Sequence, residues 1–261
     1  MAETWRGVWV VAYREILRFV ADRSRLVSSF AMPLLFLVIF GAGFSKTIGS
    51  LAPGVNYIQF MFPGIVAMTV LMNSLFSGIS VVADKEFGFL KEILVAPISR
   101  LGIVLGKAIG GSAIALIQAL VLLVLAPVVG VALSPRLIAE LAPVVVLLSL
   151  GLSCLGILIA SFMESQQGFQ LLVQVIIFPL IFLAGVFFPT NNVPGWMAFI
   201  SKVNPLTYGV DAIRQIFLGS SRGLGVTVFG HAMTLAQEVA LVAVFAAVLL
   251  TAAGAAFNRQ T

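Results

Sequence analysis

Few side chains of this 261-residue chain could support covalent or metal chemistry. Cys154 is the single cysteine and lies in an apolar run, which excludes a disulfide within the chain and predicts a buried, unreactive thiol. His231 is the single histidine and has no cysteine or carboxylate cluster near it, so metal ligation and serine–histidine catalysis are unsupported. The run GIVLGKA is one residue short of the nucleotide-binding loop G-x-x-x-x-G-K-S/T and ends in alanine. Its Gly102 and Gly106, with Gly110, instead predict close helix packing, and we expect no catalytic residue, metal or cofactor in this chain.

The segment from Asp84 to Arg100, DKEFGFLKEILVAPISR, is the longest charged interruption of the chain. Its apolar residues recur at the spacing of one helix face, formed by Phe87, Leu90, Ile93 and Leu94. Its charged residues lie toward the other side, at Lys85, Glu86, Lys91 and Glu92, and Pro97 ends the pattern. Such a helix between two membrane spans either lies flat on the membrane or binds a soluble partner through its apolar ridge. We interpret it as the docking element through which another protein drives this one.

The composition assigns the chain to the membrane proteins. Hydrophobic residues make up 61% of it, charged residues 10%, and its mean hydropathy is +1.14. A soluble domain carries about 25% charged residues, so this chain lacks the polar groups to cover a globular surface. Its net charge of +5 therefore bears on topology and lipid headgroups rather than on nucleic acid binding.

Charged residues divide the chain into an all-α arrangement of six predicted spans within a single domain, residues 1–261. Residues 1–24 contain an amphipathic helix, with tryptophans on one face and arginines on another, that we place along the inner headgroup layer. The predicted spans are 26–45, 57–83, 108–133, 141–163, 169–188 and 239–258, each offering roughly 20 apolar residues for a hydrocarbon core of about 30 Å. With the N-terminus inside, ten of the 15 basic residues are cytoplasmic and five are outside. The positive-inside rule therefore places both termini and the 84–100 helix in the cytoplasm.

Residues 189–222 do not have the pattern of a plain loop. Prolines at 189, 194 and 205 separate short apolar stretches, which predict two helices, 195–203 and 206–218, that dip into the outer leaflet. Asp211 and Arg214 lie three residues apart on the second helix, at the spacing of an ion pair. We interpret them as a helix-surface pair of small energetic weight rather than as a substrate site.

Within the spans the polar side chains are sparse amides and hydroxyls, and the only ionisable residue is Cys154. Ion-coupled transporters keep charged or histidine residues at membrane depth, so ion-coupled transport is weakly supported. Amides at this depth commonly bond a neighbouring helix, and phenylalanines commonly face lipid. The alternative is that both line an apolar path for an amphipathic cargo. The candidates for that path are Asn73, Phe76, Gln118, Gln174, Phe178 and Phe182.

Two stretches resemble motifs of a known family. DKEFGFLKEILVAPISR resembles the cytoplasmic motif of type-2 ATP-binding-cassette export permeases, in which an acidic residue, a glycine, a leucine-rich ridge and a Pro-x-Ser-Arg ending recur. FLAGVFFPTNNVPGWMAFISKVNPLTYGVDAIR resembles the second signature of the same family, before the last span. The resemblance covers nearly the whole chain. It is closest to the drug-exporter branch typified by daunorubicin-resistance permeases and extends to the lipo-oligosaccharide branch.

The resemblance implies a bacterial plasma (inner) membrane protein that is not an enzyme by itself. It implies a homo- or heterodimer of permease subunits with two separate ATPase subunits, which use ATP and Mg²⁺ to export an amphipathic drug-like, lipid or glycolipid substrate. By the same resemblance, the N-terminal helix is a second contact with the ATPase. The ATPase-docking positions carried over to this chain are Glu86, Phe87, Leu90, Glu92, Ile93 and Leu94. The motif that caps the outer end comprises Pro189, Pro194, Asn204, Pro205, Asp211 and Arg214.

Two other functions stay open from the residues alone. An ATP-independent channel or transporter would give flux from this chain alone, and the scarcity of charge at membrane depth argues against it. A non-transporting scaffold or assembly factor is suggested by the glycine-rich packing faces. It would bind partners without any nucleotide-dependent change.

Overall fold

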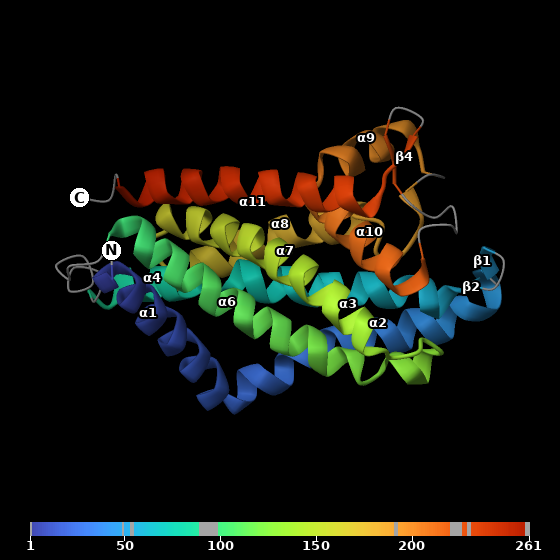
Figure 1. Ribbon diagram of the computed structural model, residues 1–261, viewed down its shortest axis with the longest axis horizontal. Coiled ribbons are helices and arrows are strands. Elements are labelled where there is room, and N and C mark those ends of the chain that lie inside the picture. Colours follow the sequence, from blue (N-terminus) through green and yellow to red (C-terminus); the bar gives the residue numbers. More distant parts are fainter. Residues whose placement is uncertain are drawn as a thin grey trace.

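The computed structural model describes residues 2–48, 50–52, 55–88, 99–190, 193–219, 226–228 and 231–258. Its helices form one elongated bundle, in which α1 (Ala2–Ala21) begins and α11 (Leu235–Asn258) ends at the same end (Figure 1). We call this the terminal end, and the opposite end, which carries α9 (Gly195–Val203) and the strands, the hairpin end. The other helices are α2 (Arg23–Ile48), α3 (Tyr57–Phe76), α4 (Ile79–Glu86), α6 (Arg100–Leu123), α7 (Pro135–Ser161), α8 (Gln166–Leu183), α10 (Pro205–Leu218) and a 3-10 turn, Ala126–Val129. Strand β1 (Ser50–Ala52) pairs antiparallel with β2 (Val55–Asn56), and β3 (Thr227–Val228) with β4 (His231–Ala232).

Within the described residues, five helical segments are long and apolar enough to cross a membrane. They are Tyr57–Glu86, Arg100–Leu123, Pro135–Ser161, Gln166–Leu183 and Leu235–Phe257. Helix α2 covers the predicted first span, but its apolar stretch, Ser29–Phe44, is shorter than the others. The chain is therefore a helical integral membrane protein, as its composition predicts, and the count of six spans stays a prediction.

The third span begins earlier than the charge pattern predicts, because Lys107 lies inside it. Helix α6 is capped by Ser99, whose hydroxyl accepts a hydrogen bond from the backbone of the first turn. Lys107 is only 2% exposed and is ion-paired within the bundle, so its charge does not mark the end of the span. The predicted range 108–133 is also wrong at its far end, since α6 ends at Leu123 and the 3-10 turn follows.

Helix α7 begins at Pro135, before residue 141, where the charge pattern predicts the start of the fourth span. Ser134 caps this helix by accepting a hydrogen bond from the backbone N–H of Leu137. Pro135 takes the first helical position, where its missing N–H leaves no unpaired donor. Ser165 caps α8 in the same way, so this span also begins earlier than predicted. Residues expected in loops are thus the caps and first turns of the spans.

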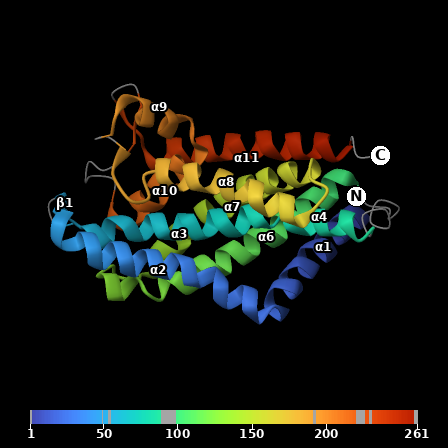
Figure 2. The same cartoon turned by 180° about the vertical axis from the view of Figure 1, so that it is seen from behind.

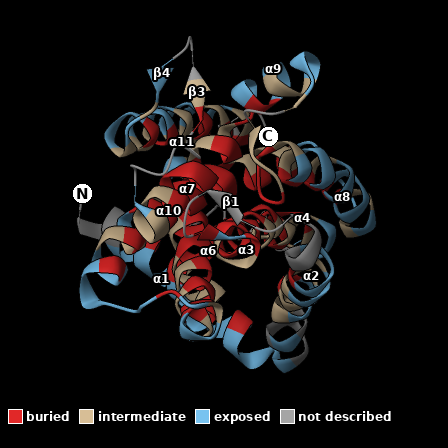
Figure 3. Cartoon of the chain, turned by 90° about the vertical axis from the view of Figure 1, so that its right-hand side faces the viewer, coloured by how far each residue is buried: buried red, intermediate tan, exposed pale blue. Residues whose placement is uncertain are grey.

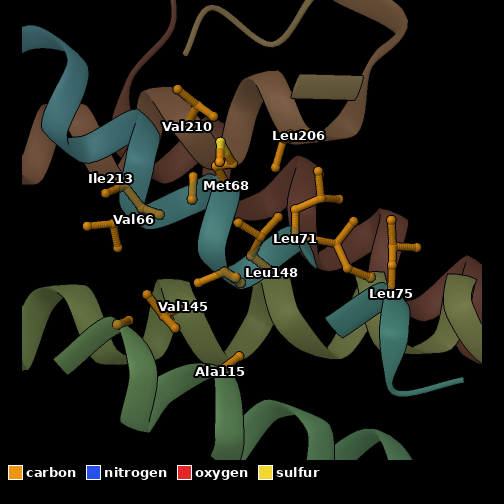
Figure 4. Packing of buried hydrophobic residues seen from close by; sticks show 14 of the residues in the cluster. Val66, Met68, Leu71, Leu75, Ala115, Val145, Leu148, Leu206, Val210 and Ile213 are labelled. Carbon is orange, nitrogen blue, oxygen red and sulfur yellow. The ribbon is translucent and has the colours of Figure 1, made fainter. Parts of the chain in front are cut away.

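The core of the bundle lies between α3, α6, α7 and α10. Figure 4 shows Leu71 of α3 beside Leu148 of α7, with Val210 of α10 on one side and Ala115 of α6 on the other. The surrounding helices α1, α2, α8 and α11 each keep an exposed face (Figure 3). Between α3 and α4 the chain turns at Gly78, whose backbone meets that of α7 at Gly156 without room for a side chain. This close crossing holds the end of α3 and the start of α4 against α7.

Helix α1 packs along α6 through two of the glycines that predicted close packing. A Cβ atom on Gly106 would lie 2.8 Å from Cβ of Val11, and one on Gly110 would lie 2.8 Å from Cβ of Glu15. The prediction of close packing is therefore confirmed at these two positions. The opposite side of α1 is exposed, with Trp9 among its apolar residues. Its placement in the headgroup layer stays a prediction.

Candidate functional site

The predicted docking helix is described only at its start. Residues 84–86 form the last turn of α4, so the prediction of a separate helix that begins at residue 84 is wrong there. Phe87 is exposed, and Gly88 has φ 79°, a conformation that favours glycine and ends the helix. Residues 89–98 lie outside the described residues. The docking roles predicted for Leu90, Glu92, Ile93 and Leu94, and for Glu86 and Phe87 before them, stay predictions.

Asp84 lies at the centre of a buried ion-pair network at the terminal end. Its carboxylate accepts hydrogen bonds from Nη2 of Arg14 at 2.9 Å and from Nζ of Lys107 at 2.8 Å. Lys107 also donates to Oγ of Ser80 at 2.8 Å and pairs with Glu15 at 3.4 Å. Asp84 and Lys107 are each only 2% exposed, so their attraction is weakly screened by water. The network joins α4 to α1 and to α6.

The next two residues of α4 bond to two further helices. Nζ of Lys85 donates to the carbonyl oxygens of Ala160 and Ser161 at 3.3 and 2.6 Å. Ala160 and Ser161 are the last two residues of α7. The C-terminus of a helix carries a partial negative charge, so a cation is favourable there. The carboxylate of Glu86 accepts a hydrogen bond from Nε2 of Gln166 at 2.9 Å, at the start of α8, where an anion is favourable.

The last turn of α4 is therefore bonded to four other helices, α1, α6, α7 and α8. These contacts come from three consecutive side chains that point in different directions around the helix. They precede directly the segment with the docking pattern.

A cavity of about 930 Å³ lies between α2, α3, α4 and α8. Figure 2 shows α2, α3 and α8 on the same side of the bundle. The polar residues that line the cavity are Asp22, Ser29, Asn73, Gln166, Gln170 and Gln174. Its other lining residues are apolar, and four of them are phenylalanines: Phe36, Phe76, Phe178 and Phe182. The cavity thus combines amide groups with a large apolar surface, which suits an amphipathic molecule.

Five of the six predicted pathway residues line this cavity, and Gln118 does not. Gln118 is buried, and its Nε2 donates to Oγ of Ser29 on α2 at 2.7 Å. It therefore bonds a neighbouring helix, as amides at membrane depth commonly do, and its role in a pathway stays a prediction. Sequence reasoning missed Gln166 and did not select Gln170 for the pathway. Their four-residue spacing with Gln174 is the signal that could have found them, because it places all three on one helix face.

Arg214 ties together three segments at the hairpin end. It is 5% exposed, and its Nη2 donates to the carbonyl of Gly185 at 2.6 Å. Its guanidinium lies 4.0 Å from the ring centroid of Phe60, and Nη1 lies 3.9 Å from Oδ1 of Asp211. Asp211 is also buried, so the prediction of a helix-surface pair is wrong. Burial lowers the pKa of Arg214 to about 10, with Asp211 and Glu238 opposing the shift, so the residue stays charged near neutral pH.

Helices α9 and α10 confirm the two predicted helices, with α10 beginning one residue earlier, at Pro205. Asn204 caps α10 and donates from Nδ2 to the carbonyl of Leu180 on α8 at 2.8 Å. Oδ2 of Asp211 accepts a hydrogen bond from the backbone of Val226 at 2.6 Å. Pro194 precedes α9, and Pro189 follows α8.

Glu238 is a further buried residue at the hairpin end that sequence reasoning missed. It lies in the first turn of α11 and is fully buried. Its Oε2 accepts a hydrogen bond from Nε2 of Gln215 on α10 at 2.9 Å. The sequence-based prediction began the last span at residue 239, because it took the charge of Glu238 as a boundary. The hydrogen bond from Gln215 gives one oxygen of this buried carboxyl group a partner on α10.

Comparison with known proteins identifies the family. Residues 6–218 match the family model of the ABC-2 type transporter. The chain belongs to the ABC-2 type transporter family. An ABC-2 permease is a transmembrane subunit that is not catalytic by itself and works with an ATP-binding partner subunit.

Relatives of this ABC-2 chain match it along most of its length. It is 33% identical over 220 residues to a protein of Cyanophora paradoxa named as a transport permease, ycf38, covering 82% of this chain and 75% of the relative. It is 28% identical over 224 residues to nodulation protein J of Rhizobium meliloti (strain 1021), covering 83% and 82%. It is 28% identical over 234 residues to the inner membrane transport permease YadH of Escherichia coli (strain K12), covering 86% and 87%.

Proposed function

We propose that this chain is the permease subunit of an ATP-driven exporter, which moves an amphipathic drug-like, lipid or glycolipid substrate out of the cell with a separate ATPase subunit. The observation that carries the proposal is the bonding of the last α4 turn to four other helices, directly before the docking segment. An ATPase that binds at residues 86–94 and moves on ATP hydrolysis displaces this turn. Its ionic partners then pass the displacement to α1, α6, α7 and α8.

The orientation and the number of spans belong to the same proposal. The basic residues favour a cytoplasmic terminal end, which places both termini and the ATPase there. Helix α2 has 26 residues, a length of about 39 Å, and serves as the first of six spans. Helices α9 and α10 then lie at the outer membrane surface and close the outer end of the pathway.

We place the substrate pathway along the cavity between α2, α3 and α8. Gln170 and Gln174 are exposed on α8, and lipid tails offer them no hydrogen-bond partner. A second permease subunit that faces α8 would cover these amides and enclose the cavity. The pathway in this arrangement runs between two copies, with the amides facing the cargo rather than lipid.

The test is co-purification of the tagged chain from its native membrane in a mild detergent, with mass spectrometry and an ATPase assay. We expect an ATP-binding-cassette ATPase at one-to-one stoichiometry. Glu86→Arg and Leu90→Asp are expected to lower its recovery at least tenfold, because each removes a docking contact. Lys202→Glu and Val128→Asp make matched charge and apolar changes at exposed sites of the hairpin end and should keep the ATPase bound.

Two results would contradict the proposal. The first is a purified chain that carries no ATPase in several detergents, which would favour a channel or a scaffold. The second is an ATPase that is recovered equally with all four variants, which would remove the docking segment from the mechanism. Size analysis of the same preparations reports whether one or two permease chains accompany the ATPase.

A further inference from the structure

The face of α8 that lines the cavity changes from polar to apolar part-way along the helix. Near the terminal end it presents Gln166, Gln170 and Gln174, one helical turn apart. Toward the hairpin end the same face continues as isoleucines and the two aromatic residues Phe178 and Phe182. At about 1.5 Å per residue, the amide part is roughly 12 Å long and the apolar part roughly 8 Å. The wall thus has two consecutive parts of opposite polarity.

The part of α2 that lines the cavity shows the same order, with a polar residue followed by an aromatic one. Ser29 lines the cavity near the terminal end of α2, and Phe36 lines it about two turns further on. Phe36 also stacks with Phe40 and contacts Phe187, so the aromatic half is continuous with packed rings. Polar groups are therefore followed by aromatic groups in the same order along both helices.

Two of the glutamine amides are available to a ligand. Gln166 is engaged by Glu86, but Gln170 and Gln174 make no hydrogen bond to any residue that the structure describes. Holding an amide at membrane depth without a hydrogen-bond partner costs free energy. A ligand that supplies hydrogen bonds removes this cost. Each amide both donates and accepts, which matches hydroxyl and amide groups.

The charged residues around the cavity indicate which class of ligand headgroup it can bind. Among the described residues that line the cavity, no lysine, arginine or histidine is present to neutralise a phosphate. The single carboxylate, Asp22, lies just before α2 at the terminal end and already takes part in an interaction of its own. A charged headgroup beside Gln170 and Gln174 would lose water without gaining an ionic partner at that depth.

We propose that the cavity binds an amphiphile with an uncharged, hydroxyl- or amide-bearing headgroup, which hydrogen-bonds Gln170 and Gln174, and a hydrophobic tail that lies along Phe178 and Phe182. This inference rests on the proposed permease function and narrows its cargo. It also fixes the orientation of the cargo, with the headgroup toward the terminal end. We expect anionic phospholipids and cationic amphiphiles to bind this cavity more weakly than an uncharged amphiphile.

The test uses the chain purified with its co-purifying ATPase and placed in lipid nanodiscs. Three probes carry the same diazirine-labelled acyl chain on different headgroups: a monoglucosyl diacylglycerol, a phosphatidic acid and a diacyl trimethylammonium lipid. After photolysis, mass spectrometry locates the labelled residues. We expect the glucosyl probe to label the apolar part of α8 about tenfold more than either charged probe, the effect of two hydrogen bonds of ordinary strength.

Variants assign the preference to the two amides. Gln170→Leu combined with Gln174→Leu is expected to reduce labelling by the glucosyl probe about tenfold, to the level of the charged probes. Gln167→Leu is the matched control, because Gln167 is exposed on the same helix but does not line the cavity. A single Gln174→Lys variant should reverse the order in favour of the phosphatidic acid probe, since it supplies the missing cation.

Equal labelling by the three probes, or a preference for a charged one, would overturn the inference. So would a glucosyl preference that the double leucine variant leaves unchanged. In both cases a bound, active ATPase in the same nanodiscs leaves the permease function intact. Loss of the ATPase from the unmodified protein would instead refute the permease function itself.

Discussion

The buried pair of Asp84 and Lys107 makes a quantitative prediction about stability. Removing one partner of a buried ion pair typically costs about 3–5 kcal/mol, because the other charge stays desolvated. Here Lys107 would keep Ser80 and Glu15 as partners after Asp84→Asn. Asp84 would keep Arg14 after Lys107→Met. We therefore expect each single variant to lose about 3 kcal/mol of unfolding free energy, at the lower end of that range.

The double variant, Asp84→Asn with Lys107→Met, is expected to lose about as much as either single variant, because no uncompensated charge of this pair is left. The coupling energy should then be about 2–3 kcal/mol, in the range measured for residues in one ionic network. The assay is equilibrium unfolding in mixed micelles of dodecyl maltoside and sodium dodecyl sulfate. It needs the two single variants, the double variant and the unmodified chain.

A second ion pair serves as the control for this double-mutant cycle. Arg136 and Glu140 form an ion pair at 2.7 Å on the surface of α7, where Arg136 is 88% exposed. The same cycle with methionine and glutamine there should give a coupling below about 0.5 kcal/mol, since water screens the charges. Equal coupling energies for the two pairs, or additive losses at Asp84 and Lys107, would refute the reasoning. The network would then not hold α4 to α6.

Two further predictions follow from packing and hydrogen bonding, and both use the same unfolding assay. Gly110→Ala should cost about 1–3 kcal/mol, because its Cβ would lie 2.8 Å from Glu15 on α1, whereas Gly43→Ala on α2 meets no atom within 4 Å and should be neutral or stabilising. A stable Gly110→Ala variant would mean that α1 is not seated closely on α6. Arg214→Lys should cost about 1–3 kcal/mol, since an ammonium cannot reproduce the guanidinium bonds at Gly185 and Phe60. Exposed Lys202→Arg should change stability by less than about 0.5 kcal/mol, and an equally small effect at Arg214 would contradict the buried geometry.

Some of the site was predictable because it depends on local pattern. Proline spacing located α9 and α10, since proline ends one helix and favours the first turn of the next. The amides and phenylalanines chosen at membrane depth include five that line the cavity, because such groups stand out in an apolar span. Glycine spacing predicted close helix packing at Gly106 and Gly110, and the structure identifies α1 as the partner.

Other features depend on partners that are distant in the chain. Lys107 and Glu238 look like boundaries in sequence, yet both are buried, because Asp84 and Gln215 reach them from other helices. Gln118 resembles the amides that line the cavity, and only the tertiary structure shows that it bonds Ser29 on α2 and does not line the cavity. No local pattern contains these pairings.

The sequence by itself determined that this chain is a helical membrane protein and where most of its helices lie. Those properties follow from composition and from spacing along one helix, which act within a few residues. The tertiary structure decided which charges are buried, which amides face the cavity, and how the last turn of α4 reaches four other helices. Those properties require groups on separate helices to meet, and the cost of burying a charge is set by the partner it meets there.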